Sequence, residues 1–393
     1  MKAMKWKFYS LAFVAGMSIL TACSSDDNND NDGNGGNGNG NEIENGTILK
    51  GTITSDVTLA AGNTYKLSGE YIVEEGATLH IEEGVKIIAV YDDIADYILV
   101  KQGGKINAVG MPDKPIVMTS EKEEPGAWGG IHICGRAHTN AEGGKGSSEI
   151  GGAVYGGNDD ADNSGTLQYI RLEYTGFAFD EEHEANGISF YGVGNGTIVD
   201  HCQAYKGSDD GFEFFGGSVN VSNLVAVSCS DDSFDWTEGW NGKGTNLVAY
   251  QEAESTLGYD CDCLMECDNN GSNNAATPVA HPVLKNLILV GNGGSKQGIR
   301  LRAGTEVEID NAKVCGKGQP LTVETALTEN ALKNGTSKLT NITLTSELSC
   351  KEGIYTHADF IAVTSNKVDA NLSYSSFEDI KKECSWMNGS WVK

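Results

Sequence analysis

Residues 207–214 read GSDDGFEF, and the motif returns at residues 229–236 as CSDDSFDW, an offset of 22 residues (229 minus 207). Weaker copies begin at Gly187, Met265 and Gly298. Apolar runs that start with Asn separate the copies, at residues 223–227, 246–250 and 286–290. Self-similarity at a short period indicates a repeat protein, in which each repeat stacks on its neighbours as one unit of a solenoid.

The period and the strand-like segments favour a β-helix over other repeat folds. Most copies lie 22 to 34 residues apart. A β-propeller blade needs about 40 residues, and a leucine-rich repeat has regular Leu and Asn spacing that this chain lacks. We therefore predict an all-β fold, a single-stranded right-handed parallel β-helix with capping segments and coils stacked about 4.8 Å apart.

The first residues have the pattern of an export signal. Lys2, Lys5 and Lys7 precede a mostly apolar run at residues 8–20, which is too short to span a bilayer as a helix. The run ends in LTAC at residues 20–23, a lipobox-like site that predicts a signal peptide over residues 1–22 and a lipid on Cys23. An ordinary cleavage site beside a coincidental Cys is the alternative.

The next segment is acidic and rich in Gly and Asn, and it contains few apolar residues. We predict a disordered tether over residues 23–46, a parallel β-helix over residues 47–318, and C-terminal coils and a cap over residues 319–393. Within these, residues 47–80 would start the solenoid and residues 376–386 would close it. An acidic stretch after a lipidated Cys resembles the surface-export signal of Bacteroidota lipoproteins, which implies a lipid-anchored protein on the outer face of the outer membrane; a tether facing the periplasm is the alternative.

The charge of the chain excludes some partners. The formal net charge is -27, and removal of the three signal-peptide Lys would make it -30. Such a chain repels phosphate backbones, so we expect no nucleic acid partner. The 51 Gly are aperiodic and accompany only 6 Pro, which excludes a collagen helix.

Several further stretches resemble a family of bacterial surface lipoproteins. They are GATLHIEEG at residues 76–84, PIVMTS at 115–120, GAWGGI at 126–131 and YGGNDDAD at 155–162. Together with the two SDD repeats, the resemblance covers most of residues 50–305. It implies the pectin-lyase-like β-helix fold and an exported location, and the family has no established activity.

Alignment of the repeats places polar side chains in a row along the solenoid. Glu213, Asp235, Glu266 and Arg300 share one register with Ser189, and Tyr191, Phe215, Thr237, Asp268 and Arg302 lie two residues further on. Strand alternation directs both rows outward, whereas the intervening aromatic residues point into the core. The first four are our candidate catalytic residues, and Tyr191, Phe215, Asp268 and Arg302 are candidate ligand-binding residues.

Carboxylates about one coil apart cannot all ionise cheaply, so one would hold a proton or a cation would lie between them. Pairs about 5 to 5.5 Å apart suit retaining glycoside hydrolysis. A solvated ladder of surface acids, a cation-binding or ligand-binding strip, and a catalytic strip all remain open.

The paired acids Asp209-Asp210 and Asp231-Asp232 precede two of these strands. At a coil corner such residues accept backbone hydrogen bonds in Asx turns. Their spacing is also similar to that of polygalacturonase-type β-helix enzymes, which use Asp residues from adjacent coils. The present chain lacks the Gly-His-Gly of those enzymes, and Arg300-Leu301-Arg302 lies too far along to match their Arg-Ile-Lys.

A cluster of oxygen ligands at residues 158–165 predicts a calcium site at Asp159, Asp160 and Asp162. Asp160, Asp162 and Ser164 occupy the first, third and fifth positions of an EF-hand-like loop. The twelfth position holds Arg171 instead of Glu, and a simple polar turn is the alternative.

The remaining candidates are aromatic residues and cysteines. Trp240 is the candidate exposed platform for a sugar ring, whereas Trp236 should be core. Nine Cys remain besides Cys23. We predict a disulfide between Cys350 and Cys384; residues 261–267 hold three more Cys, which would form a disulfide or a zinc site of no standard spacing.

These observations predict a surface protein that binds an extracellular glycan or polymer. A polysaccharide hydrolase or lyase using the carboxylate row, and a structural or adhesive solenoid, are the two alternatives. The predicted partners are therefore the glycan and, through the lipid, the membrane, with calcium as the candidate cofactor.

Overall fold

The structure is a computed structural model that describes residues 41–92, 94–179 and 183–393. The predicted signal peptide, the lipidation site at Cys23 and most of the predicted tether lie outside these residues. Among the described residues, none of the helices has the length and apolar character needed to cross a membrane. The first strand, β1 (Asn41–Ile43), pairs with a later strand, so the solenoid begins inside the segment that we assigned to the tether.

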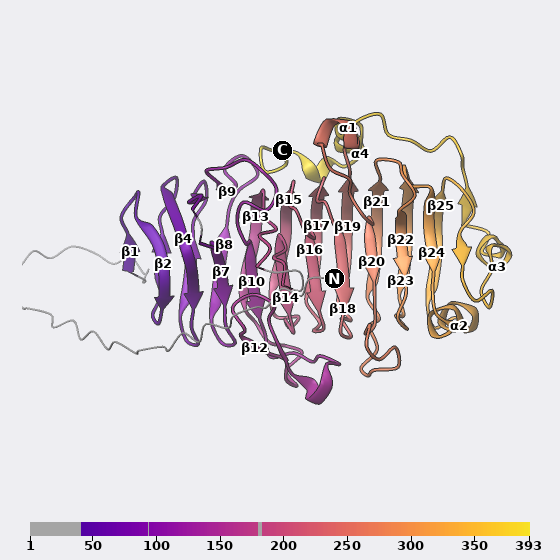
Figure 1. Cartoon of the computed structure of the whole chain (residues 1–393), viewed down its shortest axis with the longest axis horizontal. Coiled ribbons are helices and arrows are strands. Elements are labelled where there is room, and N and C mark those ends of the chain that lie inside the picture. The colour runs from indigo at the N-terminus through magenta and orange to yellow at the C-terminus, as the bar shows by residue number, and fades with distance from the viewer. Residues whose placement is uncertain (1–40, 93, 180–182) are drawn as a thin grey trace, which may run out of the picture. The chain divides into compact units, whose positions relative to one another are not determined.

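Short strands from successive coils form the first of three parallel sheets, which we call sheet 1 (Figure 1). Its first members are the second halves of β2 (Ile48–Ile53) and β4 (Thr64–Val73). The sheet continues through β7 (Tyr97–Val100), β10 (Ile131–Cys134), β14 (Ile188–Tyr191), β16 (Phe212–Phe215), β18 (Phe234–Thr237), β20 (Met265–Cys267), β22 (Gln297–Leu301), β24 (Gln319–Val323) and β26 (Ser349–Cys350).

Longer strands contribute to the other two sheets, because each bends in its middle. Sheet 2 contains β1, β3 (Val57–Leu59), β5 (Thr78–Ile81), β8 (Lys105–Val109) and the first halves of the long strands. Sheet 3 contains the first halves of β2 and β4, then β6 (Lys86–Ala89), β9 (Ile116–Ser120), the second halves of the long strands and β27 (Lys367–Val368). The long strands are β13 (Gly165–Glu173), β15 (Ile198–Tyr205), β17 (Asn220–Val227), β19 (Lys243–Tyr250), β21 (Val283–Val290), β23 (Glu308–Cys315) and β25 (Lys338–Leu344).

All pairings in these three sheets are parallel, which confirms the predicted parallel β-helix. In the described residues the antiparallel strand pair is β11 (Gly146–Ser147) with β12 (Val154–Tyr155), in a loop inserted between β10 and β13. Parallel pairing in register explains why the sequence motif repeats, since each coil places the same kind of residue at the same corner.

The bend in each long strand is made by one residue in the left-handed region of φ. Asn223, Asn246, Asn286, Asn311 and Asn341 all have φ between 55° and 64°. Asn tolerates this conformation better than most residues with a side chain. Each amide also bonds to the coil before it: Asn246 Nδ2 donates to Asn223 Oδ1 at 2.8 Å, and Asn286 Nδ2 donates to Asn246 Oδ1 at 3.0 Å. These residues, which we call the asparagine ladder, hold the corner between sheets 2 and 3.

Apolar side chains fill the interior of the solenoid. In sheet 1 the predicted inward residues Phe212, Phe214, Phe234 and Trp236 are all at most 2 % exposed. The Phe212 and Phe234 rings stack at 5.6 Å between centroids. Aromatic pairs of this kind contribute about 0.5 to 1.5 kcal/mol beyond the burial of their area.

Helices and loops interrupt the coils at their corners. The helical segments are η1 (Glu142–Gly144), α1 (Glu254–Leu257), α2 (Ala326–Asn334), α3 (His357–Ala362), α4 (Phe377–Glu383) and η2 (Ser385–Met387). Long insertions at residues 135–164, 174–187 and 251–264, and a further one at residues 268–282, all adjoin strands of sheet 1. They therefore position side chains around its outer surface.

The sequence predicts that residues 376–386 close the end of the solenoid. In the structure, the C-terminal segment does not lie at that end. Figure 1 shows α2 and α3 at the far end, whereas α4 lies back near α1. From there Ile380, Met387 and Trp391 pack on outward apolar residues of sheet 3, among them Val225 and Val248. The segment is a strap along sheet 3, because the outward face of that sheet is apolar and needs a cover.

Candidate functional site

An acidic cleft opens on the outer surface of sheet 1. Its volume is about 320 Å³, and ten carboxylates and one guanidinium line it. We call it the acid cleft, and its lining residues are Glu149, Glu184, Asp209, Asp210, Glu213, Asp231, Asp232, Asp235, Asp262, Glu266 and Arg300. Three kinds of element supply them: strands of sheet 1, the turns just before those strands, and the inserted loops.

The register of the predicted row is confirmed. Glu213 pairs with Asp235, Asp235 with Glu266, and Glu266 with Arg300 on consecutive strands of sheet 1. Ser189 lies one coil earlier, opposite Glu213, and it is fully buried. The acid cleft therefore begins at Glu213 and follows the row toward Arg300.

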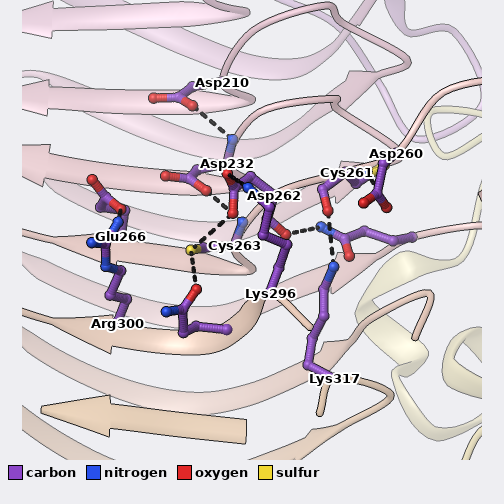
Figure 2. Close-up of polar contacts among 12 residues, drawn as sticks. Asp210, Asp232, Asp260, Cys261, Asp262, Cys263, Glu266, Lys296, Arg300 and Lys317 are labelled. Carbon is purple, nitrogen blue, oxygen red and sulfur yellow. Dashed lines mark hydrogen bonds and ion pairs between the residues drawn. The ribbon is translucent and has the colours of Figure 1, made fainter. Parts of the chain in front are cut away.

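The turn acids form a second row beside the first. Asp210 accepts a hydrogen bond from the backbone N–H of Asp232 at 2.8 Å, and Asp232 accepts one from the N–H of Cys263 at 2.6 Å. Figure 2 shows these links running from coil to coil. Asp210 and Asp232 therefore accept hydrogen bonds from backbone N–H groups, as residues of an Asx turn do. The N–H group that each accepts from belongs to the next coil and not to its own turn.

Proximity and burial oppose ionisation of these carboxyls. Burial first, and then neighbouring carboxylates, raise the pKa values of Asp210, Glu213 and Asp235 well above the usual range. The same two causes raise the pKa of Asp209 to about 8 and that of Asp231 to about 6. Without a bound cation, the acid cleft holds part of its carboxyls as neutral acids at neutral pH.

Ion pairs occupy the end of the row that contains the arginines. Glu266 accepts from Arg300 Nη1 at 2.7 Å and from Arg302 Nη1 at 2.9 Å. Arg300 also pairs with Glu324, and Arg302 with Asp268 at 2.7 Å. These carboxylates raise the pKa of the Arg300 guanidinium against the effect of its burial, so Arg300 remains a cation. Its geometry suits an ion-pair partner rather than a proton acceptor.

Donor atoms converge at several points of the acid cleft. In each of five groups, one ligand atom from each of three side chains lies within 4.8 Å of the others. Four groups consist of carboxylates: Asp210, Glu213 and Asp235; Asp232, Asp235 and Glu266; Glu184, Asp209 and Asp231; and Asp210, Asp231 and Asp232. The fifth combines Asp232, Asp262 and Cys263. Oxygen donors at this spacing are the ligands that hard divalent cations prefer.

The predicted aromatic ligand-binding residues are core residues instead. Trp240 is 1 % exposed, because its indole stacks on Phe214 at 4.2 Å and its Nε1 donates to the carbonyl of Val219. Tyr191 is fully buried beneath Tyr155, which comes from the inserted loop, and it stacks on Phe215 at 4.4 Å. These side chains support the surface without reaching it, so Trp240, Tyr191 and Phe215 are not platforms for a ligand.

The predicted calcium loop does not bring its acids together. Asp160 Oδ1 bonds both the backbone N–H and the Nδ1 of His138, Asp162 accepts from Ser164, and Asp159 accepts from the N–H of Ala161. Among the described residues, none of the three-donor groups includes any of these acids. Nearby polar groups satisfy them, which corresponds to the polar-turn alternative.

The predicted disulfide is also absent from the described chain. All nine cysteines there are free, including Cys350 and Cys384. Cys350 packs against the interior core, whereas Cys384 packs with the strap on sheet 3, so the two lie in different apolar clusters. Cys263 lies beside the acidic donors Asp232 and Asp262.

Sequence reasoning missed the loop carboxylates that complete the acid cleft. Glu149 belongs to the inserted segment 135–164, Glu184 to 174–187 and Asp262 to 251–264. Burial raises the pKa of Glu149 to about 7, with Glu238 and Glu184 adding to the effect. The sequence did contain a signal for these residues, because the insertions that flank the acidic row are themselves acidic. The repeat alignment does not include insertions, so it did not place these carboxylates in the acid cleft.

No curated protein and no solved structure matches the chain. A family model described as a pectate-lyase-like β-helix domain matches residues 51–393, which is most of the chain. The fold, its three parallel sheets and this match agree, and the chain therefore belongs to the pectate-lyase-like β-helix family, whose description indicates a carbohydrate-related role in general terms.

Proposed function

We propose that the protein binds an anionic polysaccharide through divalent cations, principally Ca²⁺, held in the acid cleft. The observation that carries the proposal is the convergence of carboxylate oxygens within 4.8 Å of one another on the outer face of a pectate-lyase-like β-helix. The cations would neutralise the carboxylates and present positive charge to acidic sugar units. In this arrangement the polymer is the ligand, and calcium ions bridge it to the carboxylates of the acid cleft.

The charge balance of the acid cleft supports a bound cation. Ten carboxylates and one guanidinium, that of Arg300, line the acid cleft. Just outside the lining, Arg302 also pairs with Glu266 and Lys296 with Asp262, so the carboxylates still outnumber the cations that reach them among the described residues. Buried carboxylates without compensation either take up protons or bind metal. In a neutral medium that contains calcium, metal binding competes with protonation, because one divalent ion compensates the charge of two carboxylates.

The chemistry of the donors favours Ca²⁺ over transition metals. Asp210, Glu213 and Asp235 offer oxygen alone, as do Glu184, Asp209 and Asp231. Ca²⁺ takes six to eight such ligands in flexible geometry and leaves room for sugar oxygens and water. The two trios share no residue, so the acid cleft has the donors for more than one ion.

The surface on which the acid cleft lies suits a chain-like ligand. Glu213, Asp235 and Glu266 repeat once per coil along sheet 1, and a parallel sheet repeats about every 4.8 Å. A polymer lying along the solenoid would meet the same kind of group several times. We further propose that this polymer is extracellular and that a lipid on Cys23 anchors the protein to the outer membrane, as the export signal predicts.

Hydrolysis of the bound polymer is a second candidate function, favoured by one specific observation. Glu213 and Asp235 lie opposite each other on adjacent strands, and the pKa of each is raised, first by burial and then by nearby carboxylates. A carboxyl that keeps its proton beside an ionised one has the properties of a general acid. Release of reducing ends from a bound glycan would distinguish this activity from binding alone.

The test of the proposed function measures calcium and polymer together. Affinity electrophoresis through polygalacturonate should retard the protein in Ca²⁺ and release it in chelator. Replacement of two ligands at once, Glu213→Gln with Asp235→Asn, should lower retention at least tenfold and weaken calorimetric Ca²⁺ binding. Glu378→Gln is the matched control, because this exposed carboxylate on α4 lies away from the acid cleft. Retention that is equal in chelator and Ca²⁺ would overturn the proposal.

A further inference from the structure

A second cavity lies beside the acid cleft and differs from it in chemistry. Its volume is about 700 Å³, within the range of roughly 300 to 1,000 Å³ typical of small-molecule sites. Its walls carry amides and hydroxyls, including Thr237, Ser272 and Asn273, together with the carboxylates Glu142 and Glu238. Among the described residues, this lining contains no basic side chain. We call the cavity the amide cavity.

The walls of the amide cavity are fixed before any ligand arrives. Asn140 Nδ2 donates to Asn269 Oδ1 at 2.8 Å and to the carbonyl of Pro278 at 3.0 Å. In return, Asn270 Nδ2 donates to Asn140 Oδ1 at 3.0 Å. These bonds join the inserted loops 135–164 and 268–282 across the outer face of sheet 1. A preformed wall lowers the entropy that a ligand must overcome on binding.

Glu238 lines the amide cavity, and hydrogen bonds hold its carboxylate in place. Its backbone has a φ of 53°, in the left-handed region that a side chain of this size rarely adopts. Thr139 Oγ1 and Tyr155 OH both donate to the same carboxylate oxygen, Oε2, at 2.6 and 2.8 Å. Within the described residues, Oε1 is then the oxygen that can accept from a ligand hydroxyl.

The amide cavity and the acid cleft adjoin each other. On β18, Asp235 lines the acid cleft and Thr237 lines the amide cavity, and residues two apart on a strand face the same side. A pair of tyrosines links the two walls: Tyr155 bonds Glu238, Tyr191 bonds Glu149 at 3.3 Å, and their ring centroids lie 5.2 Å apart. One polymer chain can therefore contact both surfaces.

We propose that the amide cavity is a subsite for an uncharged sugar unit, so that the polymer bound by this protein carries neutral sugars beside its anionic units. The inference rests on the proposed function and adds the substrate class. Neutral hydroxyls donate to Glu238 and accept from amide N–H groups. A uronate in the same place would meet two carboxylates without a basic partner, and the convergent trios that suit a cation lie in the acid cleft.

The test compares two polymers of equal length in Ca²⁺. One is polygalacturonate, and the other alternates galacturonate with neutral rhamnose. The wild-type protein should bind the alternating polymer at least tenfold more tightly. Thr237→Val removes one hydroxyl at constant shape, and Glu238→Gln removes one charge. Each should abolish most of that preference. Thr237→Val should leave calcium-dependent binding of polygalacturonate unchanged, whereas Glu238→Gln also removes a charge that acts on Glu149 of the acid cleft. Thr245→Val, on sheet 2, is the matched control.

The outcomes separate this inference from the proposed function. If chelator releases both polymers but the wild type binds them equally, or if both variants keep the full preference, the neutral subsite is wrong and the cation-dependent site stands. If chelator releases neither polymer, the proposed function is wrong. If Ca²⁺ gives retention of neither polymer, both proposals are wrong.

Discussion

At the scale of single residues, the acid cleft makes the stability of the protein depend on pH. Free Asp and Glu carboxyls have pKa values near 4. In the fold the pKa values of Asp231, Glu149 and Asp209 are raised to about 6, 7 and 8, by burial first and by neighbouring carboxylates second. Between these limits the folded state binds more protons than the unfolded state. The contribution of these three groups to stability is therefore full below about pH 4 and is lost as the pH rises through about 6 to 8.

We expect the melting temperature in chelator to fall as the pH rises from about 5 to about 8. Asp209→Asn removes one of the shifted groups and should flatten the curve. Calcium should reverse the trend at the upper end, because a ligand that binds only the folded state stabilises it. Scanning calorimetry at several pH values measures both effects. A melting temperature that is constant over this range in chelator would contradict the raised pKa values of Asp231, Glu149 and Asp209.

Residue roles were predictable where the repeat fixes them and unpredictable where loops cover the surface. Glu213, Asp235 and Glu266 have the expected register, since parallel coils align identical positions. Trp240, in the stretch EGWNG at residues 238–242, was predicted to be an exposed platform. The backbone instead turns it into the core, onto Phe214. Which side chain a turn buries depends on three-dimensional packing that a linear motif does not contain.

At the scale of elements, the asparagine ladder holds the corner of the coils. Asn246 donates to Asn223 and accepts from Asn286, and Asn286 accepts in turn from Asn311, so Asn246 and Asn286 each make two bonds along the stack. The left-handed backbone at φ 60° adds a second requirement, since a Cβ is disfavoured there by roughly 1 to 2 kcal/mol in most residues. The sequence repeats Asn at the start of these apolar runs, but the repeat alone does not reveal the bend.

Substitutions at Asn246 separate the two contributions. Asn246→Gly keeps the backbone conformation and loses both amide bonds, which should lower the free energy of unfolding by about 1 to 3 kcal/mol. Asn246→Ala loses the same bonds and adds backbone strain, so it should be about 1 kcal/mol less stable than the Gly variant. Urea denaturation measures the series, with Lys243→Ala on the same strand as the control. Equal free energies of unfolding for the Gly and Ala variants would show that backbone strain at residue 246 does not contribute to the difference in stability.

At the scale of the whole described solenoid, the strap connects coils that are far apart in sequence. Ser390 and Trp391 donate their backbone N–H groups to the carbonyl of Pro112, and Arg171 donates to the carbonyl of Ser390 at 2.7 Å. Lys393 donates its backbone N–H to Gln203 Oε1 at 2.8 Å. The C-terminal residues thus bind coils near β9, β13 and β15. Repeat proteins lack such long-range contacts in general, because each repeat touches its neighbours alone.

The strap should therefore make the solenoid unfold more cooperatively than its repeats would alone. Trp391 is fully buried and lies 5.2 Å from the His201 ring, so Trp391→Ala should cost about 3 to 5 kcal/mol. Deletion of residues 388–393 removes the ties to Pro112, Arg171 and Gln203 together. We expect its thermal transition to broaden or divide in two, since early and late coils would then melt separately. Lys382→Gln, an exposed change on α4, should leave one sharp transition. A deletion variant that still melts in one sharp step, at a lower temperature, would show that stacking between neighbouring coils alone carries the cooperativity.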